Sequence, residues 1–214
     1  MALGKTAIQQ LYRKRARNYD FTANLYYLIG FREESYRKQA IAQLALKPGD
    51  TVVDIGCGTG LNFSHLRNAV GDNGHIIGVD LTDAMLQQAR SRIETKGWHN
   101  IELTQGDAAQ YHFPSPLHGV FSSFALTMVP EYESVIANAY DALPTGGRMV
   151  ILDLKKPQHL PLWMTKIGVA ISKPFGVSLD MADRKPWETL QRYFNHVTLT
   201  DCFGGFAYIA VAEK

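Results

Sequence analysis

The sequence contains little cysteine and no long apolar run. Two cysteines among 214 residues cannot form a disulfide framework, and there is no repeated CxxC pair of the kind that binds zinc. No stretch approaches the roughly 18 uncharged apolar residues of a membrane span, and the first residues lack the apolar core of a signal peptide. A composition of 46% hydrophobic and 20% charged residues is typical of one compact domain over residues 1–214. We therefore expect a cytoplasmic protein without a metal site.

The charges are unevenly distributed, although the net charge is only +2. Residues 1–47 carry nine basic and three acidic residues, whereas the rest of the chain carries 13 basic and 17 acidic ones. Apolar residues at helical spacing between Lys5 and Arg17 predict that this arm begins as a basic amphipathic helix. Such a helix suits an anionic membrane surface, which predicts a peripheral location on its inner face. The alternatives are contact with nucleic acid and a solvated face on a helix that packs on the domain.

Strand and helix patterns alternate from Thr51 onwards, which indicates βαβ units and a parallel sheet with helices on both faces. The predicted strands are 51–55, 75–79, 100–104, 120–124 and 148–154, and the predicted helices are 31–46, 61–70, 82–96 and 131–143. Near the end of the chain, 197–200 and 206–212 alternate like a hairpin across Gly204 and Gly205. The predicted fold is a doubly wound α/β domain with a mostly parallel, seven-stranded sheet and an antiparallel C-terminal strand.

The pattern divides this single domain into four segments. Residues 1–47 form an N-terminal helical arm, 51–154 a nucleotide-binding core and 195–214 the C-terminal hairpin. Between them, 159–194 has no strand pattern and is too long for a plain connection. We expect this segment to be a helical insertion over the active site.

A glycine-rich loop follows the first predicted strand of the sheet. Gly56, Gly58 and Gly60 let the backbone turn sharply and approach a ligand, and a helix N-terminus follows. The third glycine of a dinucleotide fingerprint would fall on Leu61, and the Lys and Ser/Thr of a Walker loop are missing, so neither NAD nor ordinary ATP hydrolysis is favoured. Asp80, about 20 residues downstream, can accept both ribose hydroxyls. An adenosine with a free ribose is favoured.

The ordered set of motifs resembles the class I S-adenosylmethionine-dependent methyltransferases. It consists of Asp54-Ile55-Gly56-Cys57-Gly58-Thr59-Gly60, Val79-Asp80 with Asp83-Ala84-Met85-Leu86, and Gly106-Asp107-Ala108. The resemblance implies that Gly56, Cys57 and Gly58 line the methionine part, that Asp80 holds the ribose, that Met85 packs on the adenine, and that Asp107 and Ala108 read its amino edge. We add Asp54, Gly60, Leu81, Ser123 and Tyr19 to the cofactor site, with Tyr19 also as the catalytic residue. His118 departs from the family, which often has an acidic residue there.

Each of these residues also has a plain structural interpretation. A D-x-G-x-G loop can be a turn without a ligand, Asp80 a helix cap and Asp107 a solvated carboxylate. Their coincidence at successive strand ends favours the cofactor site.

A second resemblance concerns the acceptor. Segments 12–20, 60–63, 97–100 and 184–188 are similar to the bacterial phospholipid and betaine-lipid N-methyltransferases, which sit near the ubiquinone and menaquinone C-methyltransferases. This resemblance implies an amine on a lipid headgroup as acceptor. Cationic side chains could hold its phosphate or carboxylate, and aromatic rings its ammonium product. The residues assigned to acceptor binding are Tyr26, Lys155, Arg184, Lys185 and Trp187.

Three hypotheses about function remain at this point. The first is a methyltransferase of a lipid amine, the second a C- or O-methyltransferase of a quinone-like or other small molecule, and the third a non-catalytic protein that binds S-adenosylmethionine. Nucleic acid is not expected as a substrate, because Ser122-Ser123-Phe124-Ala125-Leu126 stands in place of the Asn/Asp-Pro-Pro-aromatic segment of amino-methylating nucleic-acid enzymes.

Overall fold

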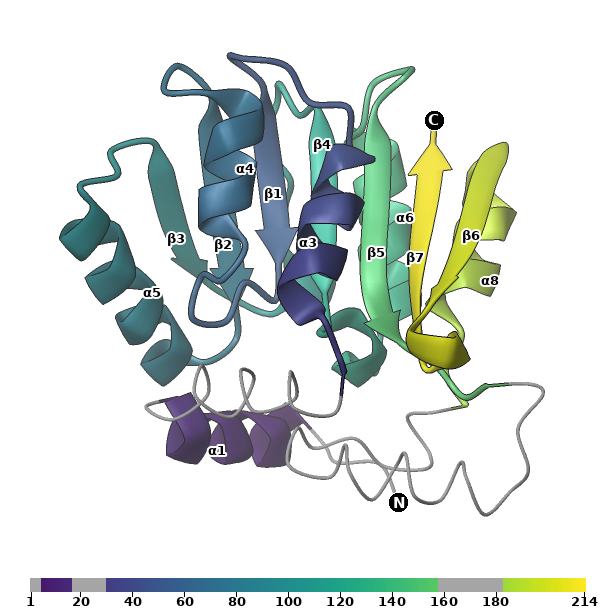
Figure 1. Ribbon diagram of the computed structural model, residues 1–214, viewed down its shortest axis with the longest axis horizontal. Helices are drawn as coiled ribbons and strands as arrows, with labels where there is room; N and C mark the ends of the chain where they lie inside the picture. Colours follow the sequence, from purple (N-terminus) through teal and green to yellow (C-terminus); the bar gives the residue numbers. More distant parts are fainter. Residues whose placement is uncertain (1–4, 17–29, 158–182) are drawn as a thin grey trace.

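A seven-stranded sheet forms the centre of the computed structural model, which describes residues 5–16, 30–157 and 183–214 (Figure 1). The strand order is β3-β2-β1-β4-β5-β7-β6, and neighbouring strands pair in parallel except β7, which is antiparallel to both β5 and β6. The strands are β1 Thr51–Ile55, β2 His75–Asp80, β3 Ile101–Gln105, β4 Gly119–Ser123, β5 Arg148–Leu154, β6 His196–Cys202 and β7 Ala207–Glu213. The predicted fold class, including the C-terminal hairpin, is confirmed.

Helices cover both faces of the sheet and one of its ends (Figure 1). On one face lie α3 Glu33–Ala42, α4 Phe63–Val70 and α5 Asp83–Lys96, and on the other α6 Tyr132–Ala142 and α8 Pro186–Tyr193. The N-terminal α1 Lys5–Arg15 lies across the carboxyl ends of the parallel strands. The short 3₁₀ helices are η3 Ala108–Gln110, η4 Leu126–Met128 and η6 Phe203–Gly205. None of these described helices is long and apolar enough to cross a membrane.

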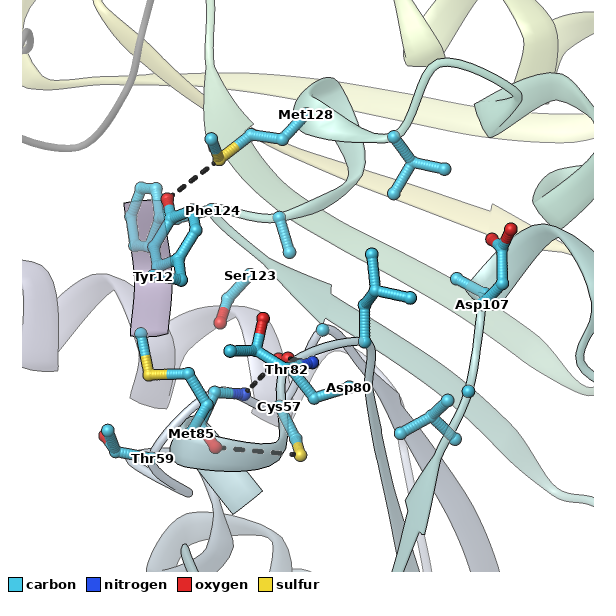
Figure 2. Close-up of a pocket in the computed structure, with 18 of the residues that line it drawn as sticks. Tyr12, Cys57, Thr59, Asp80, Thr82, Met85, Asp107, Ser123, Phe124 and Met128 are labelled. Atoms are coloured by element: carbon cyan, nitrogen blue, oxygen red, sulfur yellow. Dashed lines mark hydrogen bonds between the residues drawn. The ribbon is translucent and has the colours of Figure 1, made fainter. Parts of the chain in front are cut away.

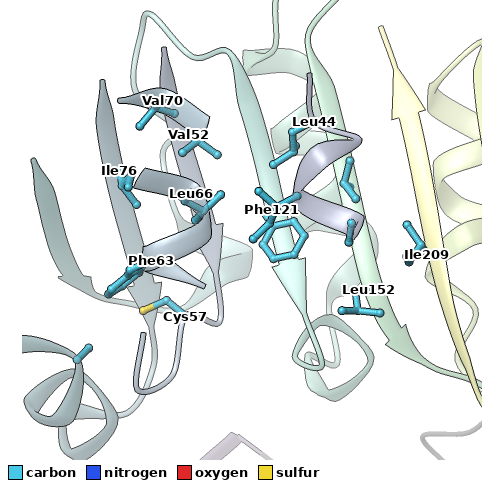
Figure 3. Packing of buried hydrophobic residues seen from close by; sticks show 14 of the residues in the cluster. Leu44, Val52, Cys57, Phe63, Leu66, Val70, Ile76, Phe121, Leu152 and Ile209 are labelled. Atoms are coloured by element: carbon cyan, nitrogen blue, oxygen red, sulfur yellow. The ribbon is translucent and has the colours of Figure 1, made fainter. Parts of the chain in front are cut away.

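The core consists of two apolar layers, one on each face of the sheet. In β1 the four residues after Thr51 are all buried, because both faces of a central parallel strand are covered. Val52 contributes to the layer under α3 and α4, together with Phe63, Leu66 and Phe121 (Figure 3), and Val53 contributes to the layer under α6 and α8. This packing makes the carboxyl ends of β1, β2 and β4 a rigid base for the loops that follow them.

Two segments are shorter or placed differently than the sequence pattern indicates. The helix predicted over 31–46 runs only from Glu33 to Ala42, and Ala45 has a left-handed backbone, with φ 52°. Within the predicted insertion 159–194, the described part forms α8, which begins with Pro186 at its first turn. Leu190 of this helix is fully buried and packs in the same layer as α6 and Tyr208. Residues 158–182 lie outside the described residues.

Candidate active site

A cavity of about 930 Å³, counted with its open mouth, lies at the carboxyl ends of β1, β2, β3 and β4. The edge of the sheet is the expected place for a ligand in an open α/β fold. Most residues of the predicted cofactor site line the cavity, namely Gly56, Cys57, Gly58, Asp80, Leu81, Met85, Asp107, Ala108 and Ser123 (Figure 2).

The glycine-rich loop is bound tightly to β2. The amide groups of Gly56 and Cys57 both donate to the Val79 carbonyl oxygen, at 2.8 and 3.1 Å. Gly56 has a φ of 69°, and a Cβ atom there would lie 2.3 Å from the Cβ of Ala125. Gly58 also has a positive φ, of 55°, but a Cβ atom at this position would meet no protein atom within 4 Å. The loop therefore leaves an open cradle at Gly58, which fits the close approach of a cofactor.

Two predicted cofactor residues support the loop without lining the cavity. Asp54 is fully buried at the end of β1, and both of its carboxylate oxygens accept hydrogen bonds from the Asn62 side-chain nitrogen, at 3.1 and 2.9 Å. Gly60 has a φ of 79°, and a Cβ atom there would lie 2.5 Å from the ring of Phe63. Both residues therefore fix the path of the loop and the start of α4.

Asp80 is the central carboxylate of the cavity. Its Oδ2 accepts a hydrogen bond from the Gly58 amide at 2.9 Å, and its Oδ1 accepts one from the Thr82 amide at 2.8 Å. Burial raises the pKa of Asp80, while these two backbone bonds act in the opposite direction. Each carboxylate oxygen has a second lone pair. Asp80 can therefore hold the loop and also accept hydrogen bonds from a ligand.

We expect Asp80→Ala to weaken binding of S-adenosylmethionine by about 1 to 3 kcal/mol, which is about 5- to 150-fold, because hydrogen bonds to a charged group are lost. Titration calorimetry measures this difference. Asp141→Ala, at an exposed position on α6, is the control and should bind as the wild type does. Unchanged affinity in folded Asp80→Ala would exclude the assignment.

Asp107, which is predicted to read the adenine, lies to the right of Asp80 in Figure 2. Asp107 precedes η3, and its Oδ1 accepts a hydrogen bond from the Ala109 amide at 3.0 Å. A Cβ atom at Gly106 would meet no protein atom within 4 Å, so there is open space beside this carboxylate. Met85, from α5, is buried at the cavity wall. The arrangement can hold a flat ring between an apolar side chain and a hydrogen-bond acceptor.

A buried polar network lies between the glycine-rich loop and α3. Asn62 Nδ2 donates to the Ser123 hydroxyl at 3.0 Å as well as to Asp54, and the Asn62 amide oxygen accepts a bond from Arg37 Nη1 at 2.6 Å. The same Nη1 donates to the Ser123 hydroxyl, and Arg37 also pairs with Glu33. Sequence reasoning missed Arg37, although its spacing of four residues from Glu33 on one predicted helix face was visible.

The N-terminal helix α1 covers the mouth of the cavity. Gln9 Nε2 donates to the Leu81 carbonyl oxygen at 3.0 Å, and Arg13 forms a two-contact ion pair with Asp83, at 2.7 and 3.0 Å. The hydroxyl of Tyr12, a lining residue, donates to the Met128 sulfur at 2.9 Å (Figure 2). One of the cations assigned to a membrane surface is thus paired within the chain. Attachment of this arm to a membrane stays a prediction.

The remaining wall of the cavity is apolar. It consists of the segment after β4, in which Phe124 has a positive φ of 52°, and of η4. Phe124, Ala125, Met128, Val129 and Pro130 all line the cavity. Thr127 does not line the cavity, and its backbone amide donates to the buried carboxylate of Asp153 at 2.8 Å. This wall can hold an apolar or aromatic acceptor next to the cofactor site.

The residues predicted to bind an acceptor headgroup do not line the cavity where the structure describes them. Arg184 Nη1 donates to the Thr127 carbonyl oxygen at 2.7 Å, behind η4. Lys155 pairs with Asp201, and Lys185 pairs with Glu188. The ring of Trp187 packs on that of Tyr208, with 4.9 Å between the two ring centres. Their role toward an acceptor stays a prediction. Tyr19 and Tyr26 lie outside the described residues.

This chain matches the model of a known protein family. The model described as the ubiE/COQ5 methyltransferase family matches residues 1–166. The chain belongs to this family. Membership confirms, at the level of the family, the methyltransferase class and S-adenosylmethionine as the cofactor.

The chain is similar in sequence to curated relatives and in fold to solved structures. The chain is 28% identical over 158 residues to a demethylmenaquinone methyltransferase of Listeria welshimeri, covering 73% of this chain and 65% of that relative's length. An S-adenosylmethionine-dependent methyltransferase of Aquifex aeolicus has a similar fold, with a TM-score of 0.62, 20% identity and coverage of 82% and 88%. A phosphoethanolamine N-methyltransferase of Haemonchus contortus, solved with S-adenosylhomocysteine, gives a TM-score of 0.62 and 21% identity, and coverage of 80% of this chain and 39% of that one.

Proposed function

We propose that this protein transfers the methyl group of S-adenosylmethionine to a ring carbon of a quinone-like aromatic compound. The observation that carries the proposal is the apolar wall of Phe124, Met128 and Val129 beside the glycine-rich loop. A flat apolar ring can pack there, next to the predicted position of the methionine part. The name of the Listeria welshimeri relative, a demethylmenaquinone methyltransferase, supports the same class of acceptor. The two findings favour this acceptor over an amine on a lipid headgroup.

The titratable groups of the cavity also support this acceptor. The two carboxylates that line the cavity, Asp80 and Asp107, belong to the predicted ribose and adenine positions, and no histidine or glutamate is among the described lining residues. An acceptor that brings its own ionisable ring hydroxyl needs little help from a general base, because ionisation makes the ring carbon nucleophilic. Hydroquinones have such hydroxyl groups.

The residues of this chain would act mainly by positioning. S-adenosylmethionine supplies a methyl group on a positively charged sulfur, which leaves as a neutral thioether. The wall at Phe124 and Met128 would hold the acceptor ring in line with that methyl group, and α1 would limit the access of water. In such a transfer the new carbon–carbon bond would form as the carbon–sulfur bond breaks, and the ring proton would leave to solvent.

An assay with two acceptors tests the proposal. The protein is incubated with S-adenosylmethionine carrying a deuterated methyl group, in one reaction with a short-chain 1,4-naphthoquinone that has a hydrogen on the ring carbon beside its chain and is kept reduced, and in another with phosphatidylethanolamine vesicles. We expect the label only in the naphthoquinone product, with NMR placing it on a ring carbon. Asp80→Ala serves as the low-activity control. Label on the lipid amine alone, or on neither compound, would contradict the proposal.

A further inference from the structure

Arg37 is a buried guanidinium at the edge of the cofactor cavity. It comes from α3, its relative exposure is only 5%, and it lines the cavity together with Ser123. One edge of the group faces Glu33, since Nε donates to Glu33 Oε1 at 3.0 Å and Nη2 pairs with the same oxygen. The other edge faces the loop, where Nη1 donates to two neutral oxygens, the Asn62 amide at 2.6 Å and the Ser123 hydroxyl. The guanidinium is thus held in a fixed plane, 5.2 Å from the Phe124 ring centre.

Charge is distributed unequally along the cavity. Arg37 is the one cationic side chain among the described lining residues, whereas the lining carboxylates are Asp80 and Asp107. In Figure 2, Asp107 and Ser123 lie on opposite sides of Asp80. Ser123 accepts a hydrogen bond from Arg37, so this cation is on the side of Asp80 away from Asp107. The methionine part of S-adenosylmethionine ends in a carboxylate. A buried carboxylate is costly unless a cation or several hydrogen bonds compensate it, and the planar arginine fork suits it best.

We propose that Arg37 binds the α-carboxylate of the cofactor through its Nη1 edge and thereby fixes the direction in which the cofactor lies. This inference rests on S-adenosylmethionine being the cofactor, as in the proposed function. The ligand carboxylate would accept hydrogen bonds from Nη1 together with, or in place of, the Ser123 and Asn62 oxygens. Both of these oxygens are neutral acceptors, whereas an anion suits this position. Arg37 would then hold the carboxylate end and Asp80 the ribose, and the sulfonium group that supplies the methyl group would be bound between these two side chains.

The test compares two ligands that differ only in this carboxylate. Titration calorimetry measures the affinity for S-adenosylmethionine and for its decarboxylated form, without any acceptor or turnover. In the wild type we expect S-adenosylmethionine to bind at least about tenfold more tightly, the usual worth of hydrogen bonds to a charged group. Arg37→Met should bring the ratio of the two affinities close to one, and Arg37→Lys should restore only part of it, because an ammonium lacks the planar fork.

Three controls keep the result unambiguous. Arg32→Met, at an exposed position just before α3, should leave the ratio as in the wild type. Asp80→Ala should weaken both ligands equally and so also leave the ratio unchanged. Arg37→Met leaves the carboxylate of Glu33 without its partner, so the double variant Glu33→Gln with Arg37→Met is measured as well. Because the ratio is taken within one protein, partial unfolding affects both affinities alike.

The outcomes separate this inference from the proposed function. A ratio that stays at the wild-type value in folded Arg37→Met or in the double variant overturns the role of Arg37, even if the protein methylates a quinone. A ratio that collapses supports the role, even if the acceptor is a different compound. Absence of binding of either ligand to the wild type overturns the cofactor assignment and this inference together.

Discussion

Gly56→Ala should abolish cofactor binding at concentrations that saturate the wild type. The new Cβ would lie 2.3 Å from the Ala125 Cβ, so the loop or the apolar wall must move. The left-handed backbone at this position costs about 1–2 kcal/mol and overpacking about 1–3 kcal/mol, so the free energy of unfolding should fall by about 2–5 kcal/mol. Thermal unfolding and calorimetry with S-adenosylmethionine measure the two effects.

Gly97→Ala provides a matched control for this variant. Gly97 ends α5 with nearly the same backbone, φ 63°, but a Cβ there would meet no protein atom within 4 Å. The control should lose only the backbone part of the stability and should bind the cofactor normally. If Gly56→Ala binds as tightly as Gly97→Ala does, the loop is not the rigid cradle that the structure indicates.

Stability should fall as the pH rises from about 4 to 7, and Asp54 should cause much of this fall. Burial in the interior raises the pKa of Asp54 from 3.8 to about 7, so in this interval the folded state holds a proton that the unfolded state has released. The native state therefore binds more protons, and the free energy of unfolding decreases with pH, by on the order of 4 kcal/mol for three pH units. Asp54→Asn should lack this component and be more stable than the wild type at pH 8.

The controls for Asp54 are two other carboxylates. Burial also raises the pKa of Asp153, to about 6, so part of the fall between pH 4 and 6 should persist in Asp54→Asn. The loss between pH 6 and 7 should shrink to the part contributed by Asp80, whose pKa burial also raises. Asp72→Asn, whose side chain is 89% exposed, should retain the full profile. Urea unfolding at successive pH values gives these curves. A decline up to pH 7 that survives in Asp54→Asn would assign it to another group.

Local patterns were sufficient to predict the sheet and the cofactor edge. Between Thr51 and Leu154, short apolar runs alternate with amphipathic helices. A short, almost wholly apolar run is typical of a parallel strand that is buried on both faces. Gly56 and Gly58 have positive φ angles, Asp80 is the last residue of β2, and Asp107 lies two residues after the end of β3. In a parallel sheet the carboxyl ends of all strands lie on one side, so these residues meet without any knowledge of distant contacts.

Contacts between distant segments decided the rest. A cation such as Lys155 or Arg184 can equally well bind an acceptor or pair within the chain, and only the folded structure places Asp201 and the Thr127 carbonyl oxygen beside them.

The sequence by itself determined the architecture of this protein and the position of its predicted cofactor site. The reason is that the periodicity of burial and the backbone freedom of glycine are local properties. Tertiary structure decided which charges face the cavity. Arg37 reaches Ser123 across 86 residues, and Tyr12 reaches Met128 across 116. Asp54 acquires its raised pKa only when packing removes water from it. Ionisation and long-range hydrogen bonding depend on the distance to groups elsewhere in the chain and on burial, and neither has a signature in the neighbouring residues.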